Sequence, residues 1–157
     1  MSHLVAVLHS LAPGTGARTR SRVDIARNAL GCATSSVVNL YPAPLPSVNA
    51  LQDPVAEVWV RGRLEIEDAL RRPDCTDIVL GYGIQEPIGR ARHEFRAQVA
   101  WLQDVLTRVE ARVWVVGGRP THPSRWHRVS FRQTPGRPFE EAARELLEPY
   151  TLVREDA

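Results

Sequence analysis

The chain has 157 residues, of which 43% are hydrophobic and 24% are charged. This is the composition of an ordinary soluble globular protein, and the length fits a single domain that spans residues 1–157. The formal net charge of +2 is too small to indicate a nucleic-acid-binding protein by charge alone.

Metal centres and membrane attachment are not expected from this sequence. The two cysteines, Cys32 and Cys75, are too few for a zinc or iron–sulfur site, and His3, His9 and His93 show no metal-ligand spacing. The N-terminal apolar run is too short for a signal peptide, and no stretch approaches the length that spans a bilayer. We therefore expect a cytoplasmic protein with reduced thiols, no metal, no cofactor and no membrane partner.

All 20 basic residues are arginine. Two interpretations are open. The absence of lysine reflects either codon bias in a GC-rich genome or a functional role of the guanidinium groups. Guanidinium binds phosphate and carboxylate through a planar pair of donors, so the second interpretation applies to particular positions.

Apolar runs separated by amphipathic stretches predict alternating strands and helices. The strands are expected at residues 3–9, 36–41, 77–81 and 113–116, and the helices at 18–30, 49–72, 90–109 and 139–147, followed by a polar tail. Within the helices, spacings of three and four predict buried faces formed by Val23, Ala26, Leu30, Leu64, Ala69, Leu70, Phe95, Val99, Leu102 and Leu106. Gly62 is expected to weaken the middle of the second helix.

This alternation predicts an α/β three-layer sandwich with a central, mostly parallel four-stranded sheet. In such sheets ligands bind outside the carboxyl ends of the strands. The loops that follow the four strands, at residues 10–16, 39–42, 81–87 and 117–124, are therefore expected to converge on one site.

The loop after the fourth strand is the strongest candidate for function. His122 lies between Pro120 and Pro123, and a histidine held in place can read a ligand or act as acid or base near neutral pH. The alternative is a histidine packed between prolines for shape alone. Ser124 follows without a Gly-x-Ser-x-Gly motif, so a hydrolytic triad is not predicted. Arg125 adds a positive charge next to it.

Two further loops carry candidate ligand-binding groups. Asn39, expected at the end of the second strand, offers an amide that matches the amide edge of a base, or it holds a neighbouring loop. Pro13 and Gly14 lead into a helix that begins near Arg18. Backbone N–H groups at a helix start bind anions, although a solvated basic helix face explains the same residues.

Taken together, five segments resemble the bacterial and phage family known as domain of unknown function number sixteen forty-three. They are VAVLHSLAPGTG, RTRSRVDIARNAL, VVNLYP, DIVLGYG and VWVVGGRPTHPSRW. The likeness covers residues 4–128 and depends on the order and spacing of all five.

The same segments are more remotely similar to the uracil-DNA glycosylase superfamily. The resemblance implies that Asn39 reads the base edge and that the loop from His122 to Ser124 polarises a base carbonyl. It matches Pro13 and Gly14 to the first motif of those enzymes, where the acidic or amide residue is replaced by Leu11-Ala12. Either Tyr41 or Tyr82 is the candidate for stacking on the base.

Three functions are therefore open. The first is an enzyme that acts on a nucleobase or nucleotide, with N-glycosidic bond hydrolysis as its reaction and His122 as its catalytic residue. The second is a non-catalytic module that binds a nucleotide or single-stranded nucleic acid through the same pocket. The third is an interaction subunit that presents Trp59, Trp101 or Trp126 to a partner.

Overall fold

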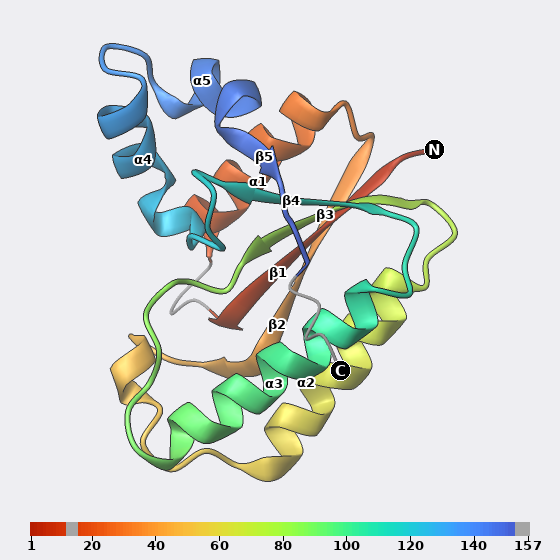
Figure 1. The fold of residues 1–157 in the computed structure, drawn as a ribbon, viewed down its shortest axis with the longest axis vertical. Coiled ribbons are helices and arrows are strands. Elements are labelled where there is room, and N and C mark those ends of the chain that lie inside the picture. The colour runs from red at the N-terminus through yellow and green to blue at the C-terminus, as the bar shows by residue number, and fades with distance from the viewer. Residues whose placement is uncertain (12–15, 153–157) are drawn as a thin grey trace.

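The computed structural model describes residues 1–11 and 16–152 (Figure 1). The predicted site residues Pro13 and Gly14 lie outside the described residues. The elements in chain order are β1 (His3–Leu11), α1 (Ala17–Leu30), β2 (Thr34–Pro44), the 3₁₀ helix η1 (Val48–Ala50), α2 (Ala56–Leu70), β3 (Cys75–Gly81), α3 (Arg90–Leu106), β4 (Arg112–Val116), the 3₁₀ helix η2 (Pro123–Arg125), α4 (Trp126–Gln133), α5 (Phe139–Leu146) and β5 (Leu147–Pro149).

A mostly parallel sheet with the strand order β2-β1-β3-β4-β5 runs through the molecule. The pairs β1–β2, β1–β3 and β3–β4 are parallel, which confirms the four predicted strands. The prediction of four strands is wrong in number, because β5 pairs antiparallel with β4 at the edge. This strand has only three residues and ends in Pro149, which an edge position tolerates.

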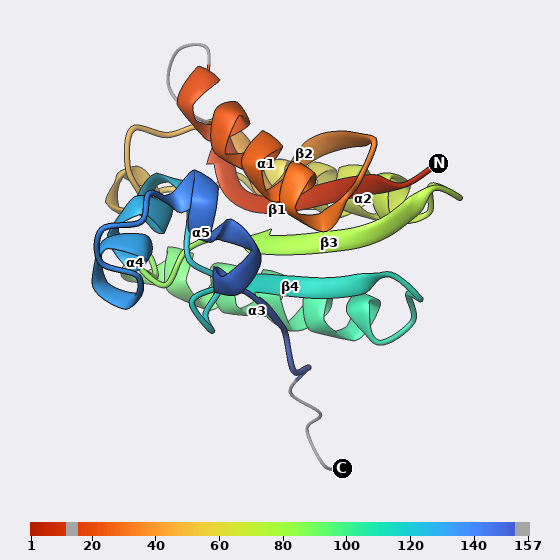
Figure 2. The same ribbon diagram turned by 90° about the horizontal axis from the view of Figure 1, so that it is seen from above.

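Helices cover both faces of the sheet, as predicted for a three-layer sandwich. α2 and α3 lie on one face, and α1, α4 and α5 lie on the other (Figures 1 and 2). Side chains of the interior strand β1 alternate between the two layers: Val5 and Val7 belong to the core under α2 and α3, and Leu4, Ala6 and Leu8 to the core on the opposite face.

The helix predicted at residues 49–72 is divided in two. The 3₁₀ helix η1 ends at Ala50, and α2 begins only at Ala56, after Pro54. The predicted burial of Leu64 is wrong: its side chain is 63% exposed, because α2 turns Trp59, Gly62, Ile66 and Leu70 toward the sheet.

Gly62 has a packing role that the sequence did not indicate. A Cβ atom at this position would lie 2.3 Å from the carbonyl oxygen of Leu40. The missing side chain therefore allows the backbone of α2 to approach β2 directly. The helix interior tolerates the glycine because of this close contact.

α4 was not predicted from the sequence. Its residue Trp126 is fully buried and donates a hydrogen bond from Nε1 to the carbonyl oxygen of Thr121, 2.8 Å away. Trp126 and Trp59 are core residues, so neither is available to a partner surface. Among residues 16–152, no helix has the length and apolar character needed to cross a membrane. Both cysteines are unpaired thiols.

Candidate functional site

A cavity of about 930 Å³ opens at the carboxyl ends of the parallel strands. Its lining comes from the end of β1, the start of α1 and the segments that follow β2, β3 and β4. The predicted site residues Arg18, Tyr82, His122, Ser124 and Arg125 all line it. The structure thus brings together the ends of strands that are far apart in the sequence.

The imidazole of His122 has a defined hydrogen-bonding state. Its Nδ1 atom accepts a hydrogen bond from the backbone N–H of Ser124 at 3.1 Å, and the Ser124 hydroxyl lies 2.9 Å from the same nitrogen. Because Nδ1 is the acceptor, the proton of the neutral ring is on Nε2. The Nε2–H of His122 is therefore a donor that has no acceptor within the described chain.

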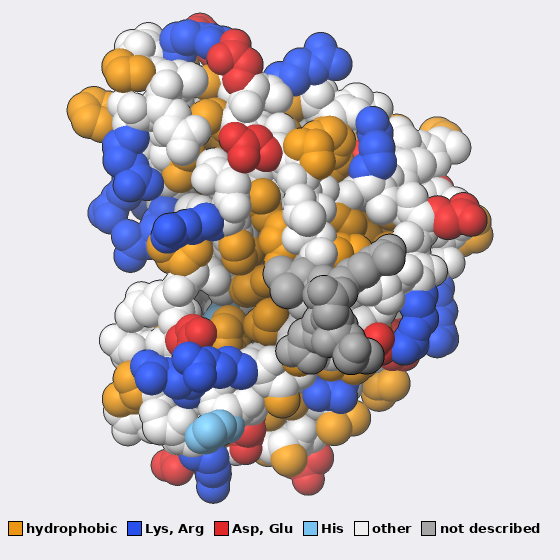
Figure 3. All heavy atoms as spheres, viewed as in Figure 1, with side chains coloured by type: hydrophobic (Ala, Val, Ile, Leu, Met, Phe, Trp, Pro, Cys, Tyr) orange, Lys and Arg blue, Asp and Glu red, His pale blue; other side chains and the backbone are white. Residues whose placement is uncertain are grey.

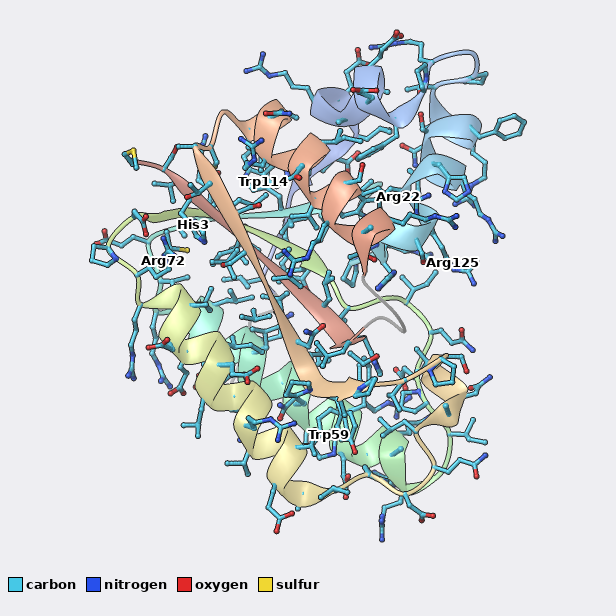
Figure 4. The ribbon with its side chains drawn as sticks, turned by 180° about the vertical axis from the view of Figure 1, so that it is seen from behind. His3, Arg22, Trp59, Arg72, Trp114 and Arg125 are labelled. Carbon is cyan, nitrogen blue, oxygen red and sulfur yellow. The ribbon has the colours of Figure 1, made fainter. Side chains whose placement is uncertain are left out.

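Electrostatics keep this imidazole neutral. Burial is the largest effect that lowers the pKa of His122, and the guanidinium groups of Arg22 and Arg125 lower it further. Arg22 and Arg125 lie at the same end of the sheet, on α1 and η2 (Figure 4). Both cations would repel an imidazolium, so the neutral form is favoured at pH 7.

The loop that carries His122 is held from three sides. Arg22 on α1 donates from Nη1 to the carbonyl oxygen of Pro123 at 2.9 Å. The backbone N–H of Gly83, after β3, donates to the carbonyl oxygen of Pro120 at 2.8 Å. Gly81 removes a side chain that would lie 3.1 Å from the Pro123 ring. Together with the buried Trp126 bond, these contacts fix the position of the imidazole.

The start of α1 forms the cationic side of the cavity. The helix is preceded by Gly16, which has a φ of 67° and no side chain to cap the helix. The first-turn N–H groups of an α-helix have no acceptor within the helix, and those of Arg18 and Thr19 belong to this turn. No ion pair of Arg18 or Arg125 occurs within the described chain. Anions bind favourably in such a place.

Two predicted site residues do not line the cavity. Asn39 is 4% exposed and lies within β2, next to Leu8, and its Oδ1 atom has no partner in the described residues. Tyr41 packs edge-on against Trp59 with ring centroids 4.7 Å apart, and its hydroxyl accepts from the N–H of Val55. Both side chains are held in the interior.

Tyr82 contributes to the cavity wall from the end of β3. Its ring is 6% exposed and packs edge-on against Phe95 at 6.2 Å. Burial raises the pKa of the Tyr82 hydroxyl, and the neighbouring Tyr150 raises it further. The phenol is therefore neutral, and the ring is positioned as an apolar wall.

His9 is a cavity residue that the sequence reasoning missed. It lies near the end of β1, is 3% exposed and stacks on Phe95 with ring centroids 5.4 Å apart. Neither ring nitrogen has a hydrogen-bond partner within the described residues. The signal in the sequence is the alternation of Val5, Val7 and His9, which places the imidazole on a buried face at the cavity end of β1.

Carboxylates do not face this cavity among the residues that the structure describes. Glu86, in the segment after β3, forms ion pairs with Arg92 at 3.6 Å and with Arg96 at 2.8 Å. Asp24 forms one with Arg27. The described part of the chain also holds no group of three or more metal-ligating side chains. No carboxylate among the described lining residues is therefore placed to activate water.

A second hollow adjoins the cavity and is strongly basic. It is lined by Arg119 and by Arg125, Arg128 and Arg132 of η2 and α4, and it shares Ile84 and Arg125 with the cavity. Phe131, which is 79% exposed, also lines it. Figure 3 shows arginine side chains gathered over α4. We call this surface the arginine groove.

The fold and the site together define a mostly parallel α/β protein with a ligand-sized cavity at the carboxyl ends of its strands. Comparison of the chain with protein-family models, with curated proteins and with solved structures finds no match. The two resemblances inferred from the motifs therefore stay predictions.

Proposed function

We propose that the cavity recognises a nucleobase or nucleotide, in a protein of the uracil-DNA-glycosylase-like type, and that its reaction is hydrolysis of an N-glycosidic bond. The observation that carries the proposal is the neutral His122, with Nδ1 bonded to Ser124 and Nε2–H left for a ligand. A neutral imidazole N–H is a suitable donor to the carbonyl oxygen of a base.

The size and division of the cavity support a nucleotide. A volume of about 930 Å³ lies within the range of small-molecule sites. His122 and Tyr82 form one part of its wall, and Arg18 with the first turn of α1 forms another. The first part suits a planar, hydrogen-bonding base, and the second suits a phosphate group.

The proposed reaction depends on stabilising the leaving group. As the bond between the sugar carbon and the base nitrogen breaks, its electron pair moves to the base, and negative charge develops on the base carbonyl oxygen. A donor fixed at that oxygen lowers the barrier. Water then adds to the sugar carbon and releases a proton to solvent. The absence of a carboxylate among the described lining residues predicts a slow enzyme.

The test is release of free base. The protein is incubated with a single-stranded uracil-containing oligonucleotide, with the matching duplex and with a panel of nucleotides, and free base is measured by chromatography. We expect release by the wild type and a loss of about 10²-fold or more in His122→Ala. His93→Ala, which removes an exposed imidazole from α3, is the matched control. Equal release by His122→Ala and the wild type would contradict the proposal.

A second candidate is a module that binds single-stranded nucleic acid without cleaving it. The arginine groove favours it, because its four guanidinium groups form no ion pair within residues 1–11 and 16–152 and adjoin the cavity. Phe131 gives the same groove an exposed ring on which a base can stack. Binding of an oligonucleotide with no base release under the same conditions would favour this module over the enzyme.

A further inference from the structure

Strand β1 carries two buried histidines that differ in how their polar atoms are satisfied. His3 is 2% exposed, and its Nδ1 and Nε2 atoms form hydrogen bonds with Thr34 Oγ1 at 2.7 Å and Ser36 Oγ at 2.8 Å. His9 is 3% exposed, and neither of its ring nitrogens has a partner in the described chain. Only the second histidine lines the cavity.

This difference indicates different roles for the two side chains. A buried polar atom without a partner lowers stability, so proteins rarely retain one for structural reasons alone. His3 lies at the far end of the sheet from Arg125, beside Arg72 (Figure 4), and its bonds tie β1 to β2. The unsatisfied nitrogens of His9 are instead found at the end of the strand where a ligand is expected.

The geometry of His9 suits recognition of a flat, uncharged group. Its ring is stacked on Phe95 with an interplanar angle of 28°, so the plane of the imidazole is fixed. Burial lowers the pKa of His9 to about 4, with His122 as the second cause, so the ring is neutral at pH 7. A neutral imidazole has one N–H donor and one acceptor nitrogen.

We propose that His9 is a second ligand-binding residue of the cavity, which acts with His122 and selects ligands that have a lactam edge, a ring C=O next to a ring N–H. This inference rests on the proposed recognition of a nucleobase. A lactam supplies both an acceptor and a donor, so it satisfies whichever nitrogen of His9 contacts it. A phosphate supplies acceptors alone, and Arg18 and Arg125 already serve that group.

Binding of three small probes to the wild type and two variants tests the proposal. The probes are uridine monophosphate, which has a lactam edge, cytidine monophosphate, whose ring nitrogen at that edge has no hydrogen, and ribose 5-phosphate, which has no base. The variants are His9→Phe and the matched control His3→Phe, and affinities are measured by calorimetry at about pH 7.5, where His9 and His122 are both neutral.

The wild type is expected to prefer uridine monophosphate to cytidine monophosphate. His9→Phe is expected to lose about tenfold in affinity for uridine monophosphate, the cost of one hydrogen bond of about 1.4 kcal/mol, and to bind ribose 5-phosphate as the wild type does. His3→Phe is expected to keep the preference. An unchanged preference in His9→Phe would overturn the proposal while leaving the proposed function standing.

Two further results separate this inference from the proposed function. If the wild type binds ribose 5-phosphate and both nucleotides with equal affinity, the role of His9 is overturned, and only phosphate binding by the cavity is supported. If the wild type binds none of the three probes, the proposed function fails and this inference fails with it.

Thermal unfolding without ligand is a second, independent measurement. His9→Phe removes two unsatisfied polar atoms and keeps an aromatic ring beside Phe95, so its melting temperature is expected to equal or exceed that of the wild type. His3→Phe removes two hydrogen bonds and is expected to melt at a lower temperature. A fall in His9→Phe as large as that in His3→Phe would show a structural role and overturn the proposal.

Discussion

The Nδ1 atom of His122 accepts the backbone N–H of Ser124 at 3.1 Å, and this hydrogen bond determines the protonation state of the candidate site. A proton on Nδ1 would place two N–H groups against each other, in addition to the repulsion from Arg22 and Arg125. Contacts within the fold therefore favour the neutral ring with its proton on Nε2, in addition to the effect of the solution pH.

The affinity for an uncharged base is predicted to depend on this protonation. Because the pKa of His122 is lowered from 6.5, the neutral ring persists below pH 6.5 and is lost only at more acidic pH. We expect the affinity for uridine, measured by calorimetry, to be constant from about pH 8 to about pH 6.5 and to weaken at more acidic pH, because a proton on Nδ1 breaks the hydrogen bond from Ser124 that positions the ring. The dependence should be reduced in His122→Gln and persist in His127→Ala. A midpoint above the ordinary histidine pKa of about 6.5 would contradict the assignment.

The arginine groove is predicted to bind a nucleic-acid strand through its phosphate groups. For a single strand, log affinity decreases with log salt, and the magnitude of this slope is smaller by about 0.7 for each phosphate that the protein no longer neutralises. The double variant Arg128→Ala/Arg132→Ala is therefore expected to reduce the slope by about 1.4, measured with an oligonucleotide by fluorescence anisotropy.

The control for this prediction is Arg71→Ala/Arg72→Ala. It removes the same charge from the other end of the sheet, where Arg72 lies beside His3 (Figure 4). Its salt slope is expected to match that of the wild type. Equal slopes in both double variants would mean that net charge, and not the groove, determines binding.

The buried His9 is predicted to make the fold sensitive to acid. Its folded pKa of about 4 lies below the ordinary histidine value of 6.5, so between these two values the unfolded chain binds more protons. Stability is therefore full above about pH 6.5 and falls toward about pH 4, by about 3 kcal/mol from this group.

Urea unfolding at about pH 7 and at about pH 4.5 measures this effect, because the first value lies above the transition and the second lies near its lower end. We expect the free energy of unfolding to change less with pH in His9→Phe than in the wild type. His93→Ala controls for the removal of an exposed histidine and should behave as the wild type does. A wild-type acid response retained in His9→Phe would contradict the prediction.

The sequence predicted the parallel sheet well because its strands are long and apolar. β1 and β3 are buried on both faces, and such strands read as continuous hydrophobic runs. β5 escaped prediction because its three residues contain Glu148 and Pro149, and only pairing with β4 makes them a strand. α4 escaped it because its eight residues offer little periodicity, and the burial of Trp126 depends on tertiary contacts.

The candidate site was predicted in part. His122 could be found because its two prolines mark a fixed loop after a strand. Asn39 was expected at a strand end, but β2 continues to Pro44, so its side chain remains inside the sheet. His9 was not predicted because it is a single polar residue at the end of an apolar run. Only the alternation of side chains along the strand shows which face of the sheet it occupies.

A buried carboxylate at the opposite end of the sheet is predicted to stabilise the fold without affecting the cavity. Asp77 is 1% exposed and accepts hydrogen bonds from Trp114 Nε1 at 2.9 Å and Thr76 Oγ1 at 2.8 Å, besides an ion pair with Arg112 at 3.0 Å. Burial alone would raise the pKa of Asp77, but these donors and the Cys32 thiol outweigh it and lower the pKa.

Asp77→Ala is expected to reduce the free energy of unfolding at pH 7 by about 3 kcal/mol, because it leaves the N–H of the half-buried Trp114 without its acceptor and removes the ion pair with Arg112. Since the folded pKa is depressed, this contribution is complete above the unfolded pKa and is lost as pH falls through the folded one. The difference between Asp77→Ala and the wild type in urea unfolding should therefore shrink below about pH 4. Asp68→Ala, an exposed change on α2, should alter stability by less than about 0.5 kcal/mol. A loss in Asp77→Ala as small as that of Asp68→Ala would contradict the stabilising role of Asp77. Weakened uridine binding in folded Asp77→Ala would contradict its separation from the candidate site.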